Sequence, residues 1–489
     1  MRVFLRNISV AAVVVTVAAV AASSGSASAR TAHGVRTYST HGTLPLRTSL
    51  DDPFTLTGPD RIVGFQKARD AGASYVRIDT SWNAIAPSTP SQGFDAADPT
   101  SPDYSWSWLD STVEAAKDAG LTPILDITNA PGWALATSHG KRILTPKVSD
   151  LGQFAKALAL HYDGTHGAPA VHVFQVWNEP NLSQDLSPVN AATYRSMVNA
   201  VATSAHAVSG ANLVVAGGLD PFGHKKGAKQ KWYATAPLAY MRSLLCLSKG
   251  KHPHRTCKSP VHFDAWSHHP YTFNGPFGHA SRPDDVSLGD LPKMRALLRA
   301  GVKLHQISSK HGVQFWVTEF SWDTKPPRRH AAPTKLAARW TAEALYQMWK
   351  SGVSLVTWFG LEDKGGKSPY QSGLYYHAKS LDRAKAKPVR TAFRFPFVAY
   401  LGGHDVSVWG RDATSDKRVV TIQRRHGSHG GWRTVAKIRS NGAGIFKASL
   451  KLAATKKDWL RAQATGSGYS LAFSLTRPSS KLRYGPWGN

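Results

Sequence analysis

The fold is decided by the stretch Val171-His172-Val173-Phe174-Gln175-Val176-Trp177-Asn178-Glu179-Pro180, in which an apolar run ends at a carboxylate. The apolar part indicates a buried strand. Much later, Phe315-Trp316-Val317-Thr318-Glu319-Phe320 repeats the arrangement. Two buried parallel strands that each end in a Glu predict two carboxyl groups at one rim, where a barrel of parallel strands gathers its reactive side chains.

From residue 46 to residue 400, short apolar runs alternate with longer amphipathic ones, an order typical of a parallel sheet with crossover helices. Eight strands are predicted, the number that closes a (β/α)8 TIM barrel, and the last helix is predicted over 388–400. An open doubly wound sheet is the competing architecture, but its Gly-rich phosphate loop is not visible in the sequence. The predicted strands span 46–51, 74–79, 122–128, 171–177, 213–218, 263–268, 314–319 and 354–358.

The last part of the chain, 402–489, has a different pattern of apolar and polar residues. Its short alternating runs, separated by Gly, Ser and Asn, predict a small all-β sandwich that loosely resembles immunoglobulin-like or fibronectin-like modules. Residues 401–489 hold sixteen Lys and Arg, four Asp and no Glu. Three interpretations of this module stay open: its aromatic rings stack on sugar faces, its Arg and Lys side chains hold an anionic wall polymer, or the rings are ordinary core residues. The aromatic residues concerned are Trp409, Trp432, Trp459 and Tyr469.

Residues 1–29 have the pattern of a signal peptide, because Arg2 and Arg6 precede an apolar stretch and Ser26-Ala27-Ser28-Ala29 offers a cleavage site. An uncleaved anchor is the alternative, but the apolar core is shorter than the roughly 20 residues that a span needs. We therefore expect a secreted protein, extracellular or associated with the cell wall. After cleavage we expect no membrane span, and a barrel domain over 30–401.

The formal net charge of +29 would attract polyanions such as acidic polysaccharide or an anionic cell-wall polymer. Solubility in a proteome rich in Arg and Lys explains the charge equally well. Nucleic acid is not an expected partner, because the chain shows neither a recognition helix nor an aromatic-basic strand motif.

The two cysteines, Cys246 and Cys257, lie eleven positions apart and predict a local disulfide in an oxidising compartment. A metal site that also uses His252 and His254 is the alternative. Neither the Cys-x-x-Cys nor the His-x-x-x-His spacing of such sites is present, so we expect no metal there.

The segment from Val173 to Leu182, with Asn-Glu-Pro at its centre, resembles the fourth-strand motif of the clan A retaining glycoside hydrolases, families 39 and 5 above all. The resemblance implies that Glu179 is the general acid/base and that Asn178 contacts the sugar 2-hydroxyl. Glu319 stands in the Thr-Glu-Phe context of the clan's nucleophile. A retaining mechanism needs these two carboxyl groups about 5 to 5.5 Å apart. The alternative is that both glutamates only close buried ion pairs at strand ends.

Other strand ends carry the same resemblance. Tyr75-Val76-Arg77-Ile78-Asp79 resembles the second-strand motif, which implies that Arg77 steadies the nucleophile. The stretch from Trp266 to Tyr271 resembles the sixth-strand His-x-Tyr pattern. It implies that Tyr271 donates a hydrogen bond to the nucleophile and that His269 lines the adjoining subsite. His268 stays an alternative to His269, since strand register decides which ring points inward.

Two tryptophans complete the expected site. Trp358 ends the eighth strand, where the clan places an aromatic floor under the sugar, and an ordinary core tryptophan is the alternative. Trp82 falls on the expected mouth side of the barrel, where an indole can pack against a sugar face.

The sequence thus predicts a retaining O-glycoside hydrolase that cleaves a β-linked polysaccharide or oligosaccharide by double displacement. We expect a monomer that needs no cofactor. The second hypothesis is a non-catalytic barrel that binds anionic cell-wall or extracellular polysaccharide. The glycan, its linkage and the choice between internal and terminal cleavage stay open.

Overall fold

The computed structural model describes residues 30–477 apart from 33–34, 43, 228–230, 274, 367, 369, 415–416 and 428. The expected signal peptide, 1–29, lies outside the described residues. Within the described ranges, every helix is too short or too polar to cross a membrane.

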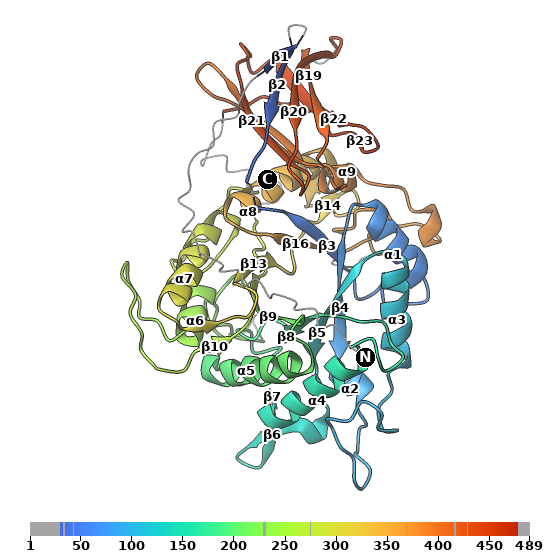
Figure 1. Cartoon of the computed structure of the whole chain (residues 1–489), viewed down its shortest axis with the longest axis vertical. Coiled ribbons are helices and arrows are strands. Elements are labelled where there is room, and N and C mark those ends of the chain that lie inside the picture. The colour runs from blue at the N-terminus through green and yellow to red at the C-terminus, as the bar shows by residue number, and fades with distance from the viewer. Residues whose placement is uncertain are drawn as a thin grey trace, which may run out of the picture.

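Eight parallel strands close into a barrel, which confirms the predicted (β/α)8 architecture (Figure 1). Each of the eight predicted strands is present, with bounds shifted by at most a few residues. Around the barrel they follow the order β3 (Arg47–Asp51), β4 (Tyr75–Ser81), β5 (Thr122–Thr128), β8 (Val173–Val176), β9 (Leu213–Leu219), β11 (Ala265–His268), β13 (Gln314–Val317) and β16 (Leu355–Phe359).

Helices surround this barrel, as the alternating pattern predicts. The last one ends early, at Arg394 rather than at residue 400, because Pro396 disfavours helical backbone at Phe395 before it. The helices are α1 (Arg61–Asp70), α2 (Trp82–Ile85), α3 (Ser107–Asp118), α4 (Val148–His161), α5 (Ala191–Val208), α6 (Pro237–Leu244), α7 (Leu291–Lys303), α8 (Thr334–Lys350) and α9 (Pro388–Arg394). Short strand pairs decorate the loops: β6 (Leu135–Ser138) with β7 (Lys141–Pro146), β10 (Val261–His262) with β12 (Ile307–Ser308), and β14 (Thr324–Lys325) with β15 (Ala332–Pro333).

The strand register separates an inner from an outer face. Because side chains alternate along a strand, residues two and four positions beyond an inward residue also point inward, nearer the C-terminal rim. The inner apolar layer contains Ile124, Val173, Val215, Ala265, Trp316 and Leu355. The next inward layer is polar and contains Asp126, Gln175, Ser267, Thr318 and Thr357, all buried. The barrel interior therefore changes from apolar to polar toward its mouth.

A second, all-β domain packs beside α8 and α9, at the top of Figure 1. Two sheets form it, in keeping with the predicted sandwich. The larger sheet contains β1 (Arg30–Ala32), β2 (Val35–Ser39), β20 (Arg433–Arg439), β19 (Val419–His426), β22 (Asp458–Ala464), β23 (Gly468–Tyr469) and β24 (Phe473–Ser474). The smaller sheet contains β17 (Phe397–Leu401), β18 (Val406–Arg411) and β21 (Ile445–Leu450).

This domain draws strands from both sides of the barrel, which differs from the expected division at 30–401 and 402–489. β2 pairs in parallel with β20, and β17 pairs with β18. Tyr38 of β2 is buried in the sandwich core, so the segment that precedes the barrel completes a sheet made otherwise from the end of the chain.

Trp409 is a core residue of the contact between the two domains. Its ring centroid lies 5.5 Å from that of Trp349 and 5.3 Å from that of Tyr346, both on α8. The indole is buried, so of the four aromatic residues named for the sandwich, Trp409 is a core residue and has no exposed face for a sugar.

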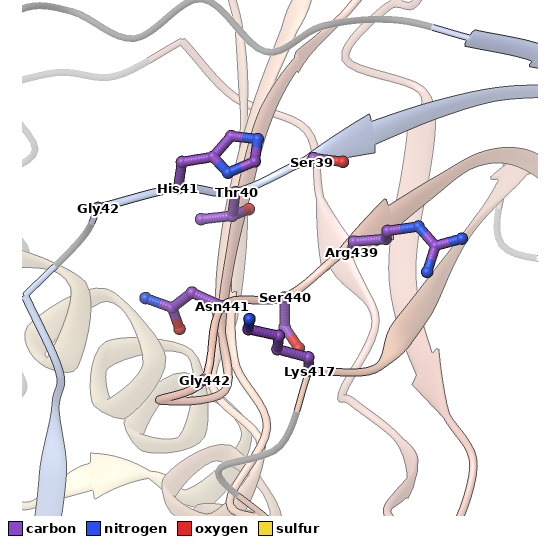
Figure 2. A pocket seen from close by; sticks show the side chains of 9 residues that line it. All are labelled: Ser39, Thr40, His41, Gly42, Lys417, Arg439, Ser440, Asn441 and Gly442. Atoms are coloured by element: carbon purple, nitrogen blue, oxygen red, sulfur yellow. The ribbon is translucent and has the colours of Figure 1, made fainter.

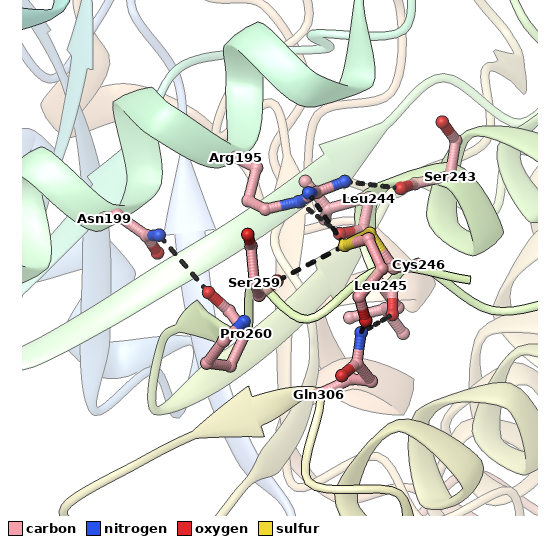
Figure 3. The surroundings of a disulfide bond; sticks show 10 residues. Arg195, Asn199, Ser243, Leu244, Leu245, Cys246, Ser259, Pro260 and Gln306 are labelled. Atoms are coloured by element: carbon pink, nitrogen blue, oxygen red, sulfur yellow. Dashed lines mark hydrogen bonds between the residues drawn. A yellow bond between two sulfur atoms is a disulfide. The ribbon is translucent and has the colours of Figure 1, made fainter. Parts of the chain in front are cut away.

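The predicted disulfide is present between Cys246 and Cys257 (Figure 3). It closes a loop between α6 and β11, which is held to its surroundings by two polar side chains. Arg195 of α5 donates to the Leu244 carbonyl at 2.8 Å, and Gln306 donates to the carbonyls of Leu245 and Cys257. The disulfide therefore closes the loop on itself, and the two side chains hold the loop to the barrel wall.

We predict that the double substitution Cys246→Ser/Cys257→Ser lowers the free energy of unfolding by about 3 kcal/mol, the loop entropy released when so short a loop opens. Urea unfolding followed by circular dichroism measures the change, with reductant-treated wild-type protein as the control. An unfolding midpoint equal to that of the oxidised wild type would contradict a structural role for this bond.

Candidate active site

The two predicted glutamates converge on one imidazole nitrogen. His269 Nδ1 lies 2.9 Å from Glu179 Oε1 and 3.8 Å from Glu319 Oε2. The sum of these two distances, 6.7 Å, is therefore the largest separation that the two oxygens can have. Both carboxyl groups are mostly buried but keep some solvent exposure. A substrate atom that enters the barrel mouth can thus meet both.

An unusual backbone carries Glu179 to this position. Trp177 and Glu179 have positive φ angles of 69° and 38°, a left-handed conformation that is uncommon for non-glycine residues and is enriched at functional sites. The Glu179 amide donates to the Gly218 carbonyl at 3.1 Å. Beside it, a Cβ atom on Gly217 would lie 2.2 Å from the Ser267 carbonyl oxygen, so only glycine fits between β9 and β11. The close approach of these strands therefore fixes the turn that carries Glu179.

Arg77 is the central cation of the site. It points inward from β4, and its guanidinium group bonds to Asp51 of β3 and to Asp126 of β5. It also donates to Asn178 Oδ1 at 2.9 Å and lies 3.7 Å from Glu319 Oε2. One buried cation therefore orients both the predicted sugar-binding amide and one of the two glutamates.

The site contains more acid than base. Asp79, at 3.2 Å, is the fourth carboxyl group around Arg77, and one guanidinium cannot balance four negative charges. Burial raises the pKa of Asp126 to about 8, although Arg77 opposes this shift. Burial likewise raises the pKa of Asp51 well above its ordinary value. The cluster therefore retains protons at neutral pH.

Glu179 belongs to the same electrostatic system. Burial raises its pKa well above the ordinary value, and the negative charge of Glu319 and then that of Asp185 add to the shift. A carboxyl group with a raised pKa keeps its proton at a pH where most glutamates have lost it, which is the property of a general acid.

The His269 ring can form a hydrogen bond with Glu179 whether the Glu179 carboxyl group is protonated or ionised. Burial lowers its pKa to about 4, so the imidazole is neutral at neutral pH and carries one proton. Its second nitrogen, Nε2, lies 3.2 Å from the Thr318 hydroxyl, which bonds in turn to the Ser267 hydroxyl at 3.1 Å. Because each hydroxyl can donate or accept, the proton on the ring can sit on either nitrogen.

Tyr271 fixes the other oxygen of Glu319. Its hydroxyl donates to Glu319 Oε1 at 2.6 Å, and burial raises the pKa of Tyr271 so that it stays a donor. Glu319 is thus held on one side by Tyr271 and faces Arg77 and His269 on the other. His268 points outward instead, with Nε2 2.9 Å from the Val286 carbonyl, so the register selects His269.

The structure does not bring Trp358 and Trp82 to the mouth. Leu355 points inward, so alternation turns Trp358 outward against Phe393 of α9, and its side chain is 1% exposed. Trp82 is 0% exposed and stacks on Phe154 of α4 at 5.0 Å. Neither indole offers a free face to a sugar.

Phe359 takes the place that the sequence assigned to Trp358. It is the last residue of β16 and shares the inward parity of Leu355. Its ring lies 5.5 Å from that of Tyr370, which lies 5.7 Å from that of Phe54. Tyr370 and Phe54 are exposed, so three aromatic rings form one side of the rim.

Sequence reasoning also missed several acidic side chains. Asp51 ends β3, and Asp126 lies near the end of β5. Asp185 accepts from Asn178 Nδ2 at 3.3 Å, and burial raises its pKa to about 7. Asp220 directly follows β9, and burial together with the charge of Glu179 raises its pKa to about 8. For Asp51, Asp126 and Asp220, the position at or near the end of a strand was the available signal. Across the described ranges, no group of three or more His, Cys, Asp or Glu has the arrangement of a metal site.

Solved structures of low sequence identity share the fold. The GH39 enzyme from Xanthomonas axonopodis pv. citri is 16% identical, with a TM-score of 0.51 and coverage of 87% of this chain and 96% of that chain. A monomeric beta-xylosidase from Caulobacter crescentus CB15 is 14% identical, with a TM-score of 0.51 and coverage of 87% and 98%. A GH39 beta-xylosidase from Caulobacter crescentus is 18% identical, with a TM-score of 0.50 and coverage of 79% and 85%.

No curated protein matches the chain in sequence. One protein-family model does match it: Cellulase (glycosyl hydrolase family 5) covers residues 49–361, which is more than half of the chain and includes Glu179 and Glu319. The match confirms the resemblance to clan A glycoside hydrolases. The chain therefore belongs to glycosyl hydrolase family 5, and the protein is a glycoside hydrolase.

Proposed function

We propose that the protein is a retaining hydrolase of β-linked polysaccharide or oligosaccharide, with Glu319 as nucleophile and Glu179 as general acid/base. The observation that carries the proposal is that His269 Nδ1 contacts both carboxyl groups, which bounds their oxygens within 6.7 Å of each other. Retaining enzymes hold their carboxyl groups about 5 to 5.5 Å apart, whereas inverting enzymes need about 6.5 to 9.5 Å to admit water. The bound favours the retaining arrangement.

In the first step, a Glu319 oxygen attacks the anomeric carbon and forms a glycosyl ester. The bond to the leaving oxygen breaks, and that oxygen takes the bond's electron pair together with the proton of Glu179. Tyr271 and Arg77 keep Glu319 in place for the attack. Asn178, oriented by Arg77 and Asp185, is the side chain that we expect to bond to the sugar 2-hydroxyl.

In the second step, water attacks the anomeric carbon, Glu179 takes its proton, and Glu319 leaves as a carboxylate. Formation of the ester removes the negative charge of Glu319, which is one of the causes that raise the pKa of Glu179. The pKa of Glu179 is therefore lower in the intermediate, so the carboxylate that proton donation leaves stays ionised until water attacks. The same residue can then act as a base.

We further propose that the enzyme acts outside the cytoplasm as a monomer. The pattern of residues 1–29 and the Cys246–Cys257 bond support export, since disulfides persist in oxidising compartments. Membership of a hydrolase family and the presence of both glutamates favour catalysis over the alternative of a barrel that only binds polysaccharide.

Glu179→Gln and Glu319→Ala should each lower kcat by about 100-fold or more, because each removes a group that reacts with the substrate. Azide should restore turnover of an activated glycoside by Glu319→Ala and give a product of inverted configuration. Glu114→Gln, on the exposed face of α3, is the matched control and should keep full activity. Unchanged kcat in either site variant would contradict the assignment.

The pH dependence should follow the raised pKa of Glu179. The first step needs a protonated Glu179, so kcat/KM should fall as pH rises through that pKa, well above the usual range of a glutamate. The chain contains only five glutamates, so ¹³C NMR of δ-labelled glutamate can follow each titration. In Glu319→Gln, which lacks one cause of the shift, Glu179 should titrate at lower pH than in the wild type. Ordinary titration of Glu179 in the wild type would contradict this prediction.

Phe359→Ala and Trp358→Ala form a matched pair that tests the register of β16. Phe359→Ala should lower kcat/KM by about 10-fold and leave stability nearly unchanged, because an aromatic contact at the mouth is lost. Trp358→Ala should lower the free energy of unfolding by about 3 to 5 kcal/mol, because it leaves a cavity against α9. Steady-state kinetics and urea unfolding of both variants measure the two effects, and the reverse pattern would overturn the register argument.

A further inference from the structure

Five side chains on or beside the larger sheet are linked by cation–π contacts that alternate rings with guanidinium groups, and we call this set the Arg-aromatic ladder. Arg461 Cζ lies 4.0 Å from the ring centroid of Tyr469 and 4.3 Å from that of Trp432. Arg425 Cζ lies 4.8 Å from the Trp432 centroid and 5.7 Å from that of Trp459. The order along the ladder is Tyr469, Arg461, Trp432, Arg425 and Trp459.

The ladder lies on the outer face of the sandwich. Ile422 of β19 and Leu460 of β22 are fully buried in the core, so their neighbours in sequence point the other way. Arg425 faces Trp459 directly in the antiparallel pairing of these strands, and Arg461 faces Gln423. Tyr469 is exposed. The ladder is thus a surface feature and leaves the packing between the sheets to apolar side chains.

The two guanidinium groups lie over aromatic rings but are not neutralised. Neither forms an ion pair with a carboxylate in the described part of the domain; Asp458, the acid of β22, pairs with Arg424 and His426. Arg461 Nε donates to Gln423 Oε1 at 2.8 Å, whereas Arg425 Nε is buried and has no hydrogen-bond partner. A guanidinium group that lies over a ring keeps the N–H donors at its edge, and an oxyanion can accept from those donors that reach solvent.

The basic surface extends beyond the ladder. Lys437 and Arg439 of β20 pair with Thr421 and Val419 of β19, which share the outward parity of Arg425. Beyond Arg439 lies a pocket of about 410 Å³ that Lys417 and His41 also line (Figure 2). Lys437, Arg439 and Lys417 therefore extend the cationic surface from the ladder across β20.

At the other end, Trp459 lines a pocket of about 380 Å³ between the sheet and α8, together with Lys335 and Arg339. A chain bound along the ladder would therefore pass directly beside the barrel domain.

We propose that the Arg-aromatic ladder binds an acidic polysaccharide of the uronic-acid type. Each uronate unit has an apolar C–H face, which packs on a ring face that no guanidinium group covers, as at the exposed Tyr469, and a carboxylate, which accepts two parallel hydrogen bonds from a guanidinium fork. A neutral glycan would leave Arg425 and Arg461 unmatched, and a phosphate polymer would leave the rings unmatched. Charge complementarity agrees, since 401–489 holds sixteen Lys and Arg against four Asp.

The test is affinity electrophoresis and calorimetry of the full chain with polygalacturonate, with Glu179→Gln as the background so that no cleavage interferes. Fully methyl-esterified polygalacturonate removes the charge but keeps the sugar rings, and inorganic polyphosphate keeps charge without rings. We expect measurable binding to polygalacturonate and at least 10-fold weaker binding to the other two polymers. No binding to polygalacturonate, or equal binding of all three polymers, would overturn the proposal.

Two variants and one control locate the site. Arg425→Gln/Arg461→Gln should weaken binding to polygalacturonate by at least 10-fold. Lys456→Gln/Lys457→Gln removes the same charge from exposed positions of the same domain and should weaken it by less than about 3-fold, the effect of net charge alone. Trp432→Ala keeps both arginines and should also lose at least 10-fold, with circular dichroism as a check of folding. Equal losses in the arginine and lysine variants, or full affinity in Trp432→Ala, would overturn the proposal.

Discussion

The contact of His269 Nδ1 with both Glu179 and Glu319 is the constraint on which the rest of the site depends. It requires that strands β8, β11 and β13 keep one register, because a shift of one residue would turn each side chain to the opposite face. Gly217 permits the close approach of β9 to β11, and the left-handed backbone at Glu179 completes the turn. The barrel thus positions two acids that lie far apart in sequence.

The excess of buried acid around one guanidinium group gives the site its chemistry. Arg77 faces four carboxyl groups, and its single positive charge cannot balance four carboxylates. Some of the buried carboxyl groups therefore keep their protons. Glu179 lies at the edge of this cluster, next to Glu319, and burial and repulsion together raise its pKa. In the mechanism that we propose, both the proton that Glu179 gives and its later role as a base depend on whether Glu319 carries a charge.

Sequence patterns were sufficient for the barrel and for six of the polar residues that meet in its mouth. They failed at Trp358, where the local motif has the right residue type but alternation turns it outward and leaves Phe359 at the rim. They also could not reveal that β2 joins β20, because the pairing links segments about 400 residues apart. The burial of acids such as Asp51 was not predicted, because a carboxyl group is expected in a protein interior only when the cation that pairs with it is known. The residues brought together as expected are Arg77, Asn178, Glu179, His269, Tyr271 and Glu319.

Covalent labelling tests the central claim most directly. A series of activated 2-deoxy-2-fluoro β-glycosides, covering the common pyranoses, would be incubated with the enzyme, followed by proteolysis and mass spectrometry. The two-carboxylate account predicts a single glycosyl adduct on the peptide that contains Glu319, formed at the rate at which activity is lost. An adduct on another carboxylate, or complete resistance to the fluorinated form of a glycoside that the enzyme hydrolyses, would contradict it.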